Sequence, residues 1–567
     1  MTLYQWFVFF LFIQIVHFLG TWKLYEAAGR KKWEAAIPVY NAIVLMKIIG
    51  RPTWWTLLLF IPIINLIMFP VIWVETLRTF GKRSQLDTIL GVITCGLYIY
   101  YINYTQKLDF NKERSLHPKN KTADTVSSLL FAIIVATLVH TYFVQPYTIP
   151  TSSLEKSLLI GDFLFVSKVN YGARVPMTTV ALPMVHDSIP MTKRKSYLSW
   201  PQLPYLRLPG IEDKIKRTDI VVFNWPVDTV HYFFEPKGSP GVIKPTDKES
   251  NYVKRCLGTP GDVLEIKDGI VFIDGKVLVL PERAKPQFEH TVYAAKGVSS
   301  EVLLTSGSTE FNRIYTLKPT SDEQIKAVQP YILNASQNED KSFTVLTGFN
   351  GIPSKIIESS GIYAQEKYEA KNDVNLTLKA AAELRKNASI DSVVIHIAKK
   401  TAIDTGVFPH NTNWTMDNYG PITIPEEGKT VVLNQQNLPL YKRIIETYEG
   451  NTLENKDGII KINGEITKSY TFKQNYYWMM GDNRHRSEDS RYWGYVPEDH
   501  IVGKPVFIWM SWDTNGKGLN KVRWDRVFTT VSGEGQPQSY FKIFLILLAV
   551  FFVGEYFWKK RKEKTNL

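Results

Sequence analysis

The longest apolar runs of this chain lie toward its two ends. Residues 1–22 carry no charged side chain. A cleavable signal peptide would have a basic start and a small-residue cleavage site, so we predict a permanent membrane anchor here. Residues 52–74, 126–146 and 540–558 are also long enough to cross a bilayer as helices. The ends of the chain therefore predict several transmembrane helices.

Two further apolar segments are weaker candidates. Residues 35–49 are interrupted by Pro, Asn and Lys, which favours a place at the membrane interface. Residues 88–106 are shorter and contain glycine. A full span there would leave Arg78, Lys82 and Arg83 on the outer side, so a re-entrant segment is the alternative.

Basic residues beside the apolar runs predict the orientation, because cytoplasmic loops retain Lys and Arg. One basic group precedes the run at 126–146 and another follows the run at 540–558. The groups are Lys107, Lys112, Arg114, Lys119 and Lys121, and Lys559, Lys560, Arg561 and Lys562. With both groups in the cytoplasm, the chain from about residue 147 to residue 539 lies on the outer face.

The outer region is predicted to be rich in β-strands. Short runs of β-branched and aromatic residues occur at 163–166, 220–223, 263–266 and 271–273, with Gly, Pro and Asp between them. Asn463-Gly464 lies between two further apolar runs and predicts a hairpin with a type I′ turn.

Between 281 and 408 the pattern changes, since strand signals are few and residues 379–389 favour a helix. We interpret this stretch as an α/β insertion of unknown purpose. The predicted organisation is a membrane domain (1–125), an anchor (126–146), a catalytic β domain in two parts (147–280 and 409–539), the insertion (281–408), and a C-terminal transmembrane helix with a basic tail (540–567).

Charge and cysteine content exclude some classes of function. The formal net charge of +13 would fit nucleic acid or anionic lipid. Much of it lies beside apolar runs, at 30–32 and 559–562, where it more often sets topology, and the sequence has no RNA-binding pattern. We therefore expect no nucleic-acid partner.

Cys95 lies in an apolar run and Cys256 in the outer region. With only these two cysteines, we expect no disulfide, metal cluster or redox pair.

Three short segments carry candidate chemistry. The first is a hydroxyl cluster, Thr151-Ser152-Ser153, just after the anchor; alone it also fits a turn or a solvated loop. The second contains Lys254 among apolar neighbours in a strand. A buried lysine has a lowered pKa and can act as a base toward a serine, although Lys254 or Arg255 pointing to solvent is an equal alternative.

The third segment, residues 480–494, combines turn formers and polar residues between aromatic ones. Such a loop can form a hydrogen-bonded platform, and Asp489 and Arg491 could pair within it. A simple capped turn is the alternative reading.

Together the three segments resemble the bacterial type I signal peptidase (leader peptidase) family. Residues 481–494 have its pattern of Gly-Asp-Asn-Arg, two variable residues, Ser, one variable residue, and Asp-Ser-Arg-Tyr-Trp-Gly. Residues 217–223 resemble a family strand that shapes the cleft. The resemblance covers 129–511, apart from the insertion. It implies a mainly β catalytic domain with a signal-peptidase-like β-barrel fold, anchored by several transmembrane helices.

The resemblance implies roles for the matching residues. Ser153 would be the nucleophile and Lys254 the general base. Thr151 would donate its hydroxyl to the oxyanion, and Ser487 would hydrogen-bond the Lys254 amine. Asp489 and Arg491 would support the site. The residues that would line shallow substrate pockets for small side chains are Tyr147, Ile149, Leu154, Leu158 and Val253.

The sequence departs from the family pattern in a few places. The departures are Ser152 for Gly, Leu154 for Met, Lys156-Ser157 for Pro-Thr, and His485-Arg486 where Asp and Asn are frequent. They leave the serine–lysine pair intact but leave substrate preference open. Ser152 lies beside Ser153, so either serine could match the nucleophile position of the family. The spacing to Leu158 and Gly161-Asp162 favours Ser153.

The function so implied is removal of signal peptides from exported precursors after small residues of the Ala-x-Ala type, through an acyl-enzyme. No metal or organic cofactor is needed. The protein would be a multi-pass protein of the bacterial inner membrane with its catalytic domain outside. Its partners would be signal peptides and membrane lipids, and contact with translocation machinery is left open because no residue indicates it.

Two other functions compete with this one. Ser153-Leu154-Glu155-Lys156 fits the Ser-x-x-Lys pattern of penicillin-binding proteins, but that motif opens a helix and here it follows a proline and precedes a strand-like run. A non-catalytic receptor or assembly factor on the same fold is the second alternative. Retention of Ser153, Lys254 and Ser487 together argues against it.

Overall fold

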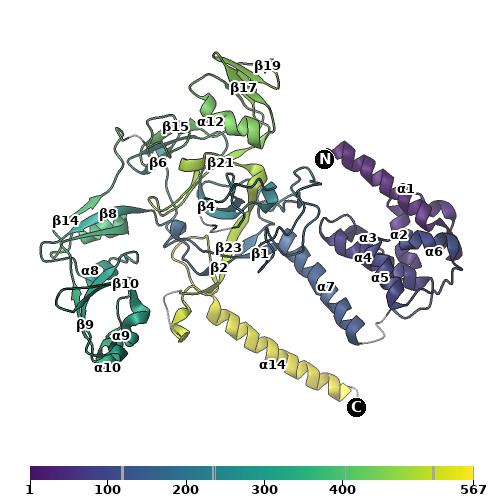
Figure 1. Ribbon diagram of the computed structural model, residues 1–567, viewed down its shortest axis with the longest axis horizontal. Helices are drawn as coiled ribbons and strands as arrows, with labels where there is room; N and C mark the ends of the chain where they lie inside the picture. The colour runs from purple at the N-terminus through teal and green to yellow at the C-terminus, as the bar shows by residue number, and fades with distance from the viewer. Residues whose placement is uncertain (117–120, 233–234, 236–237, 403, 514–517, 566–567) are drawn as a thin grey trace.

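The computed structural model describes residues 1–116, 121–232, 235, 238–402, 404–513 and 518–565. Its centre is an antiparallel sheet of eight strands in the order β1-β2-β23-β3-β4-β21-β22, with β24 paired to β23 (Figure 1). These strands are β1 (Val144–Thr148), β2 (Asp162–Ser167), β3 (Ile220–Asn224), β4 (Asn251–Gly258), β21 (Tyr476–Met480), β22 (Val496–Pro497), β23 (Ile501–Ser511) and β24 (Thr529–Thr530). Neighbours in this sheet come from distant parts of the chain.

A second sheet, in the order β15-β5-β6-β7, shares a hydrophobic core with β4 and β21. Leu264 and Ile266 of this sheet and Trp478 of β21 are fully or almost fully buried in that core. The surrounding elements are β5 (Val263–Lys267), β6 (Ile270–Ile273), β7 (Lys276–Val277), β15 (Tyr419–Thr423), β16 (Thr430–Val432), α12 (Leu438–Arg443), β17 (Leu453–Lys456), β18 (Ile459–Ile462), β19 (Glu465–Ile466) and β20 (Ser469–Thr471).

The strands predicted from apolar runs are confirmed. The runs at 163–166, 220–223, 263–266 and 271–273 lie within β2, β3, β5 and β6. The predicted hairpin is also confirmed, since Ile462 pairs with Glu465 across the turn. Asn463 and Gly464 both have positive φ, 53° and 85°, as a type I′ turn requires.

The stretch from 281 to 408 contains many strands, so the expectation of few strands there is wrong. They form two small sheets, β13-β8-β14 and β10-β11-β9-β12. Their elements are β8 (Gln287–Tyr293), α8 (Ser300–Thr305), β9 (Arg313–Lys318), α9 (Asp322–Val328), β10 (Ile332–Gln337), β11 (Phe343–Thr347), α10 (Ser354–Ser360), β12 (Tyr363–Lys367), β13 (Lys371–Thr377), α11 (Leu378–Leu384) and β14 (Ser392–Ile395). Several of these strands are short and largely exposed, so cross-strand pairing rather than apolar alternation defines them.

Each small sheet has its own hydrophobic core. The first lobe joins β13-β8-β14 to α8 and α11 around Val292, Leu303 and Ala381. The second lobe joins β10-β11-β9-β12 to α9 and α10 around Tyr315 and Val345. Figure 1 shows both lobes on the left of the central sheet, opposite the N-terminal helices.

The N-terminal helices pack around a shared apolar core. They are α1 (Leu3–Ala27), α2 (Tyr40–Ile48), α3 (Trp55–Leu58), α4 (Ile64–Thr79), α5 (Gln85–Ile93) and α6 (Tyr98–Thr105). The predicted single span at 52–74 is wrong, because residues 59–63 interrupt the helix between α3 and α4. Helices α5 and α6 bend by 119° at their junction, which fits either a broken span or a re-entrant loop.

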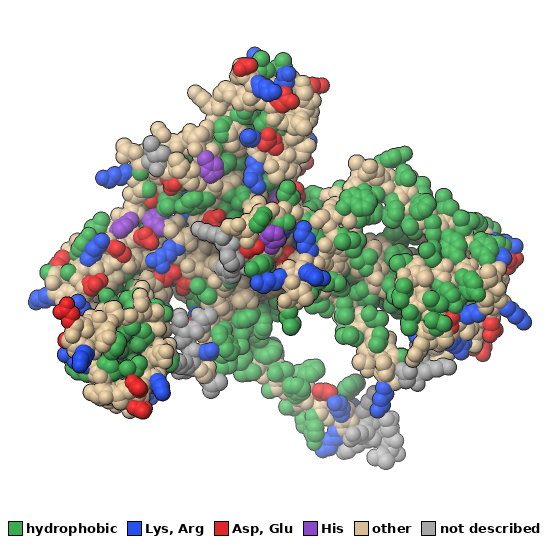
Figure 2. Space-filling view, in the orientation of Figure 1, with side chains coloured by type: hydrophobic (Ala, Val, Ile, Leu, Met, Phe, Trp, Pro, Cys, Tyr) green, Lys and Arg blue, Asp and Glu red, His purple; other side chains and the backbone are tan. Residues whose placement is uncertain are grey.

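Three helices are long and apolar enough to cross a membrane: α1, α7 (Lys121–Tyr142) and α14 (Phe541–Thr565). Helix α7 leads directly into β1, and α14 follows the central sheet. Figure 2 shows hydrophobic side chains along α14, which projects from the molecule in Figure 1. The orientation stays a prediction; Lys119 of the basic group, and the last two residues of the tail, lie outside the described residues.

Candidate active site

Ser153 lies in a short loop between β1 and β2. Backbone hydrogen bonds close this loop at its base, from Ile149 N to Asp162 O and from Gly161 N to Ile149 O, each 2.9 Å. A single 3-10 turn, Ser152–Leu154, carries the serine, which is only 7% exposed. Ser153 is therefore buried in a hydrogen-bonded loop, whereas Thr151 of the same hydroxyl cluster is exposed.

Lys254 reaches this loop from the middle of β4. Its Nζ donates a hydrogen bond to Ser153 Oγ at 2.6 Å. The lysine is 3% exposed, and burial lowers its pKa to about 8, although the carboxylates of Asp489 and Glu488 oppose the shift. The alternative in which Lys254 or Arg255 points to solvent is wrong, because both side chains are 3% exposed.

Asp489 and Arg491 form the predicted pair in the loop after β21. Arg491 Nε and Nη2 donate to the two carboxylate oxygens of Asp489 at 2.8 and 2.9 Å. Burial opposes ionisation of Asp489, but the charge and hydrogen bonds of Arg491 outweigh it and lower the pKa. Asp489 also accepts the backbone N–H of Gly481 at 3.1 Å, and Arg491 Nη2 donates to Arg484 O at 2.6 Å. The pair thus fixes both ends of this loop.

The same loop holds the nucleophile loop in place. Asn483 donates its backbone N–H to Ser153 O and its side-chain amide to Ser152 O, each at 3.1 Å. At Gly481 an added Cβ would lie 2.5 Å from Ser153 O and 2.2 Å from Ser487 Oγ. Only glycine allows the two loops to approach this closely.

Ser487 and Thr151 make no contact of the predicted kind in this structure. Ser487 Oγ is buried and has no hydrogen-bond partner among the described residues, so its bond to Lys254 stays a prediction. Thr151 is exposed and extended, beside Ser153. Its role toward an oxyanion also stays a prediction.

The predicted pocket residues gather in one apolar cluster next to Ser153. Ile149, Leu154 and Leu158 are buried in it, with exposures of 4%, 1% and 0%. Tyr147 and Val253 are partly buried and pack against the same cluster. Strands β1 and β4 supply Tyr147 and Val253, so the cluster lies beside both reacting groups.

Sequence reasoning missed a second buried ion pair. Arg255 Nε and Nη2 donate to the two carboxylate oxygens of Asp482 at 2.8 and 2.6 Å. Ser157 Oγ donates to the same carboxylate at 2.6 Å. Burial opposes ionisation of Asp482, but Arg255 and Ser157 lower its pKa overall. The two basic residues of β4 point to opposite faces: Lys254 contacts the nucleophile and Arg255 braces the loop that holds it.

Residues from the 281–408 stretch also reach the site and had no signal in the sequence. Gln287 exchanges backbone hydrogen bonds with the loop after β21, donating to Asp482 O at 2.8 Å and accepting from Arg484 N at 2.9 Å. Asn375 Nδ2 donates to Asn483 Oδ1 at 2.6 Å. Both side chains are at most 1% exposed. The first lobe therefore forms one wall of the site.

Among the residues that the structure describes, no group of three or more His, Cys, Asp or Glu side chains could hold a metal ion. The chemistry available at this site is that of a buried amine in contact with a serine hydroxyl. Such a pair can carry out nucleophilic attack on a carbonyl group.

Comparison with known proteins identifies a family and several relatives of the chain. The model of the family described as signal peptidase, peptidase S26, matches residues 122–353 and 425–512, which is more than half of the chain. A family of unknown function (DUF5684) matches residues 33–113. The chain is 22% identical to a signal peptidase I of Buchnera aphidicola (subspecies Acyrthosiphon pisum) over 72% of its own length and 82% of the relative's. It is 26% identical to a signal peptidase I of Rickettsia canadensis over 35% of this chain and 58% of that one.

Proposed function

The chain belongs to the signal peptidase family, peptidase S26, and from that premise we propose that it is a membrane-bound serine endopeptidase with Ser153 as nucleophile and Lys254 as general base. It removes the signal peptides of exported precursors after small residues of the Ala-x-Ala type. The observation that carries the proposal is the 2.6 Å contact between Lys254 Nζ and Ser153 Oγ inside a buried site.

Each step of the reaction follows from this pair. With its pKa lowered to about 8 by burial, Lys254 is partly neutral near neutral pH and can take the proton of the Ser153 hydroxyl. The serine oxygen attacks the carbonyl carbon of the residue before the cleavage site. The oxyanion receives hydrogen bonds from the Thr151 hydroxyl and the Ser153 backbone N–H; losing one such bond typically costs about 3 to 4 kcal/mol.

Breakdown of the intermediate uses the same amine. Lys254, now protonated, gives its proton to the leaving amine, and the signal peptide stays bound to Ser153 as an ester. Water activated by neutral Lys254 then hydrolyses this acyl-enzyme. Ser487 would orient the amine through its otherwise unpartnered hydroxyl. Asp489 and Arg491 keep the supporting loop rigid.

The apolar cluster around Leu154 and Leu158 supports a preference for small side chains. Tyr147 and Val253, both partly buried, pack against it, and we take the pocket that they would line to be shallow. A small residue would fit there, while a large one would need these side chains to move.

Membrane anchoring and domain organisation belong to the same proposal. Helices α1, α7 and α14 would cross the bacterial inner membrane, with residues 1–125 as a membrane domain and the catalytic β domain outside. Residues 281–408 would be an insertion into this domain. Because β1 follows α7 directly, the site would lie near the lipid surface where signal peptides end. Lipids and precursors are then the partners, and translocation machinery is a further candidate.

The penicillin-binding alternative is not supported. Its Ser-x-x-Lys motif needs a helix that places the lysine one turn from the serine. Here a single 3-10 turn ends at Leu154, and Lys156 Nζ donates to Gly307 O, just after α8 of the first lobe, at 2.5 Å. Lys254, and not Lys156, contacts the serine.

The test is cleavage of a precursor with an Ala-x-Ala site by the detergent-solubilised full chain. Wild type is compared with Ser153→Ala and Lys254→Ala, and Ser152→Ala serves as the matched control for the register. We expect cleavage after the final Ala by wild type and the control only. An intact precursor with folded wild type would favour the non-catalytic receptor, and activity that survives in Ser153→Ala would move the nucleophile to Ser152.

A further inference from the structure

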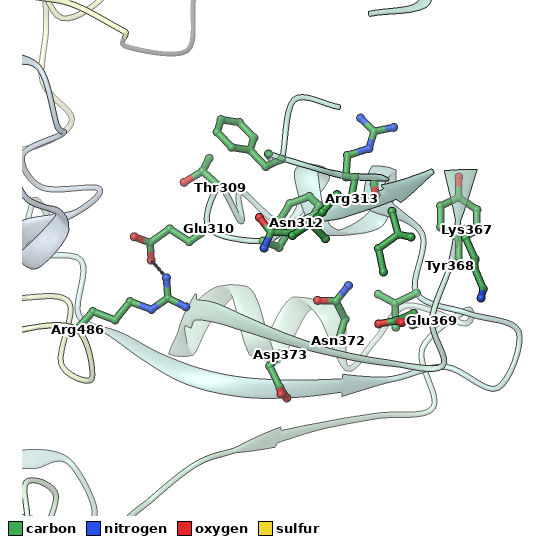
Figure 3. A pocket seen from close by; sticks show the side chains of 17 residues that line it. Thr309, Glu310, Asn312, Arg313, Lys367, Tyr368, Glu369, Asn372, Asp373 and Arg486 are labelled. Carbon is green, nitrogen blue, oxygen red and sulfur yellow. Dashed lines mark ion pairs between the residues drawn. The ribbon is translucent and has the colours of Figure 1, made fainter. Parts of the chain in front are cut away.

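A cavity of about 560 Å³ lies between the two lobes of the 281–408 stretch. Its volume is within the range of about 300 to 1,000 Å³ that ligand sites occupy. Figure 3 shows Thr309, Glu310 and Asn312 on one side of it, and Asn372 and Asp373 on the other. The walls come from elements with separate hydrophobic cores, so the cavity is a cleft between two folded bodies.

Arg486 is one of the residues that line the cavity, and its side chain is partly exposed. This arginine comes from the loop after β21, and its Nη1 lies 3.4 Å from Glu310 Oε2 (Figure 3). Glu310 also accepts a hydrogen bond from Asn375 Nδ2 at 2.8 Å and from Asn483 Nδ2 at 3.4 Å. Asn483 Nδ2 in turn donates to Ser152 O. A hydrogen-bond network thus connects Glu310, which lines the cavity, with the nucleophile loop.

Electrostatics show the same proximity. Burial and, next, the Glu310 carboxylate raise the pKa of Glu155 to about 7. Glu155 lies two residues after Ser153. The carboxylate of Glu310, which lines the cavity, is therefore close enough to raise the pKa of Glu155 in the nucleophile loop.

Strand β13 leads from the catalytic loop into the cavity. Asn375 of this strand is bound to Asn483, and Asn372 and Asp373 line the cavity. Three residues of strand cover about 10 Å. In the described part of the chain, β13 is an edge strand that pairs only with β8. An edge strand offers backbone groups to an extended peptide.

The cavity lining is polar and of mixed charge. Glu310, Glu369 and Asp373 line it together with Arg313, Lys367 and Arg486. Arg313 is held by Glu366 through two hydrogen bonds of 2.6 and 2.5 Å, which fixes the far end. Such a lining suits a polar peptide and is unsuited to the apolar core of a signal peptide.

The position of the lobes separates the two halves of a precursor. Figure 1 shows the lobes on the opposite side of the central sheet from α7 and the N-terminal helices. If α7 crosses the membrane as proposed, a signal peptide would reach the site from the side where α7 leads into β1. The chain beyond the cut would then continue on the other side of the central sheet, where the lobes lie.

We propose that the cleft between the two lobes binds the first residues of the mature part of the precursor, as an extended segment with polar side chains. This inference rests on the proposed function. Asn312 and Asn372 would then determine specificity for the precursor residues that follow the cleavage site. The 281–408 stretch would thereby have a role in substrate selection.

The first experiment maps contacts directly. A photo-crosslinking residue is placed at each of about the first ten mature positions of a precursor, a length of up to about 35 Å when extended. Each precursor is bound to full-length Ser153→Ala protein in liposomes, and the crosslinked residues are identified by mass spectrometry. We expect crosslinks to residues 309–314 or 367–373 from positions beyond about the third. Crosslinks confined to β1, β4 and the nucleophile loop would overturn the proposal.

The second experiment fills the cleft. Asn312→Trp places a large side chain in it, and Asn312 makes no side-chain hydrogen bond in the described structure that would be lost. Gln337→Trp, on an exposed position of β10 in the same lobe, is the matched control. Two substrates are compared: a full precursor, and a peptide that ends two residues after the cleavage site.

We expect Asn312→Trp to lower kcat/KM for the full precursor by about tenfold and to leave the short peptide unchanged, while Gln337→Trp affects neither. Equal kcat/KM for the full precursor in Asn312→Trp and wild type would overturn the proposal. An equal loss of kcat/KM on both substrates would also overturn the proposal, because the cleft would then support the structure of the site without binding the mature segment. Failure of wild type to cleave either substrate would instead refute the proposed function, so the two failures are distinguishable.

Discussion

The side-chain amide of Gln287 donates a hydrogen bond to the backbone carbonyl of Glu155, with 2.8 Å between nitrogen and oxygen. The two residues are 132 positions apart in the sequence. Through this bond, and through its backbone bonds to Asp482 and Arg484, Gln287 joins the nucleophile loop to the loop after β21. A residue outside the recognised motif segments therefore helps to position Ser153.

Gln287→Leu tests this positioning. The variant keeps the backbone bonds but leaves the Glu155 carbonyl without its buried donor, which costs about 1 to 3 kcal/mol of folding stability. We expect kcat to fall by about tenfold with little change in KM, because the nucleophile shifts while the apolar cluster stays. The measurement is precursor cleavage kinetics together with chemical unfolding. Gln337→Leu, at an exposed position, should match wild type; an unchanged kcat in Gln287→Leu would show that the bond is dispensable.

Gly481→Ala tests the close approach of the two loops. The added methyl group would meet Ser487 Oγ at 2.2 Å and Ser153 O at 2.5 Å. Because Ser153 O is a backbone atom, the loop must move, and we expect a loss of about 1 to 3 kcal/mol in stability and most of the activity. Gly241→Ala is the control, since its nearest neighbour would lie at an ordinary 3.4 Å. If Gly481→Ala cleaved the precursor at the wild-type rate, activity would not require the close approach of the two loops.

Activity should depend on pH through Lys254. Burial lowers its pKa to about 8, and only the neutral amine can accept the serine proton. We therefore expect kcat/KM to rise about tenfold per pH unit below pH 8 and to level off above it. The profile is measured with a short peptide substrate. A rate that keeps rising toward the usual lysine pKa of 10.5 would contradict the assignment.

The same group makes stability depend on pH. Its folded-state pKa lies below its unfolded value, so between about pH 8 and 10.5 the unfolded chain binds more protons. The contribution of Lys254 to the free energy of unfolding therefore increases with pH across that window. Lys254→Met should remove this slope and gain about 1 to 3 kcal/mol near neutral pH while it loses activity. A variant that is less stable than wild type at neutral pH would contradict the prediction that the buried charge of Lys254 destabilises the folded protein.

Asp489 and Arg491 should be strongly coupled. Arg491→Met leaves a buried carboxylate without its cation, which costs about 3 to 5 kcal/mol. Asp489→Leu alone should be similarly harmful, and the double variant less harmful than the sum of both. Chemical unfolding of the three variants gives the coupling energy. Additive losses would show that the two buried side chains act independently, despite their two hydrogen bonds.

The proposed catalytic residues could be predicted from the sequence because they lie in short, specific segments. Residues 481–494 match the family pattern, and Ser153 and Lys254 lie in the two other segments that carry the resemblance. Apolar length identified the candidate spans α1, α7 and α14. The prediction of a single span at 52–74 is wrong, because total apolarity does not reveal that residues 59–63 divide it into α3 and α4.

Local features could therefore be predicted from the sequence: candidate reactive residues, helices that are apolar enough to span, and the turn at Asn463-Gly464. The fold was needed to show what Lys254 faces, which atoms hold Ser153, and that a cleft lies between the two lobes of 281–408 beside Glu310. These features depend on contacts such as Gln287–Glu155 and Asn375–Asn483, which join residues more than a hundred positions apart. Hydrogen bonds of this kind follow from how sheets pack, and no periodicity along the chain encodes them.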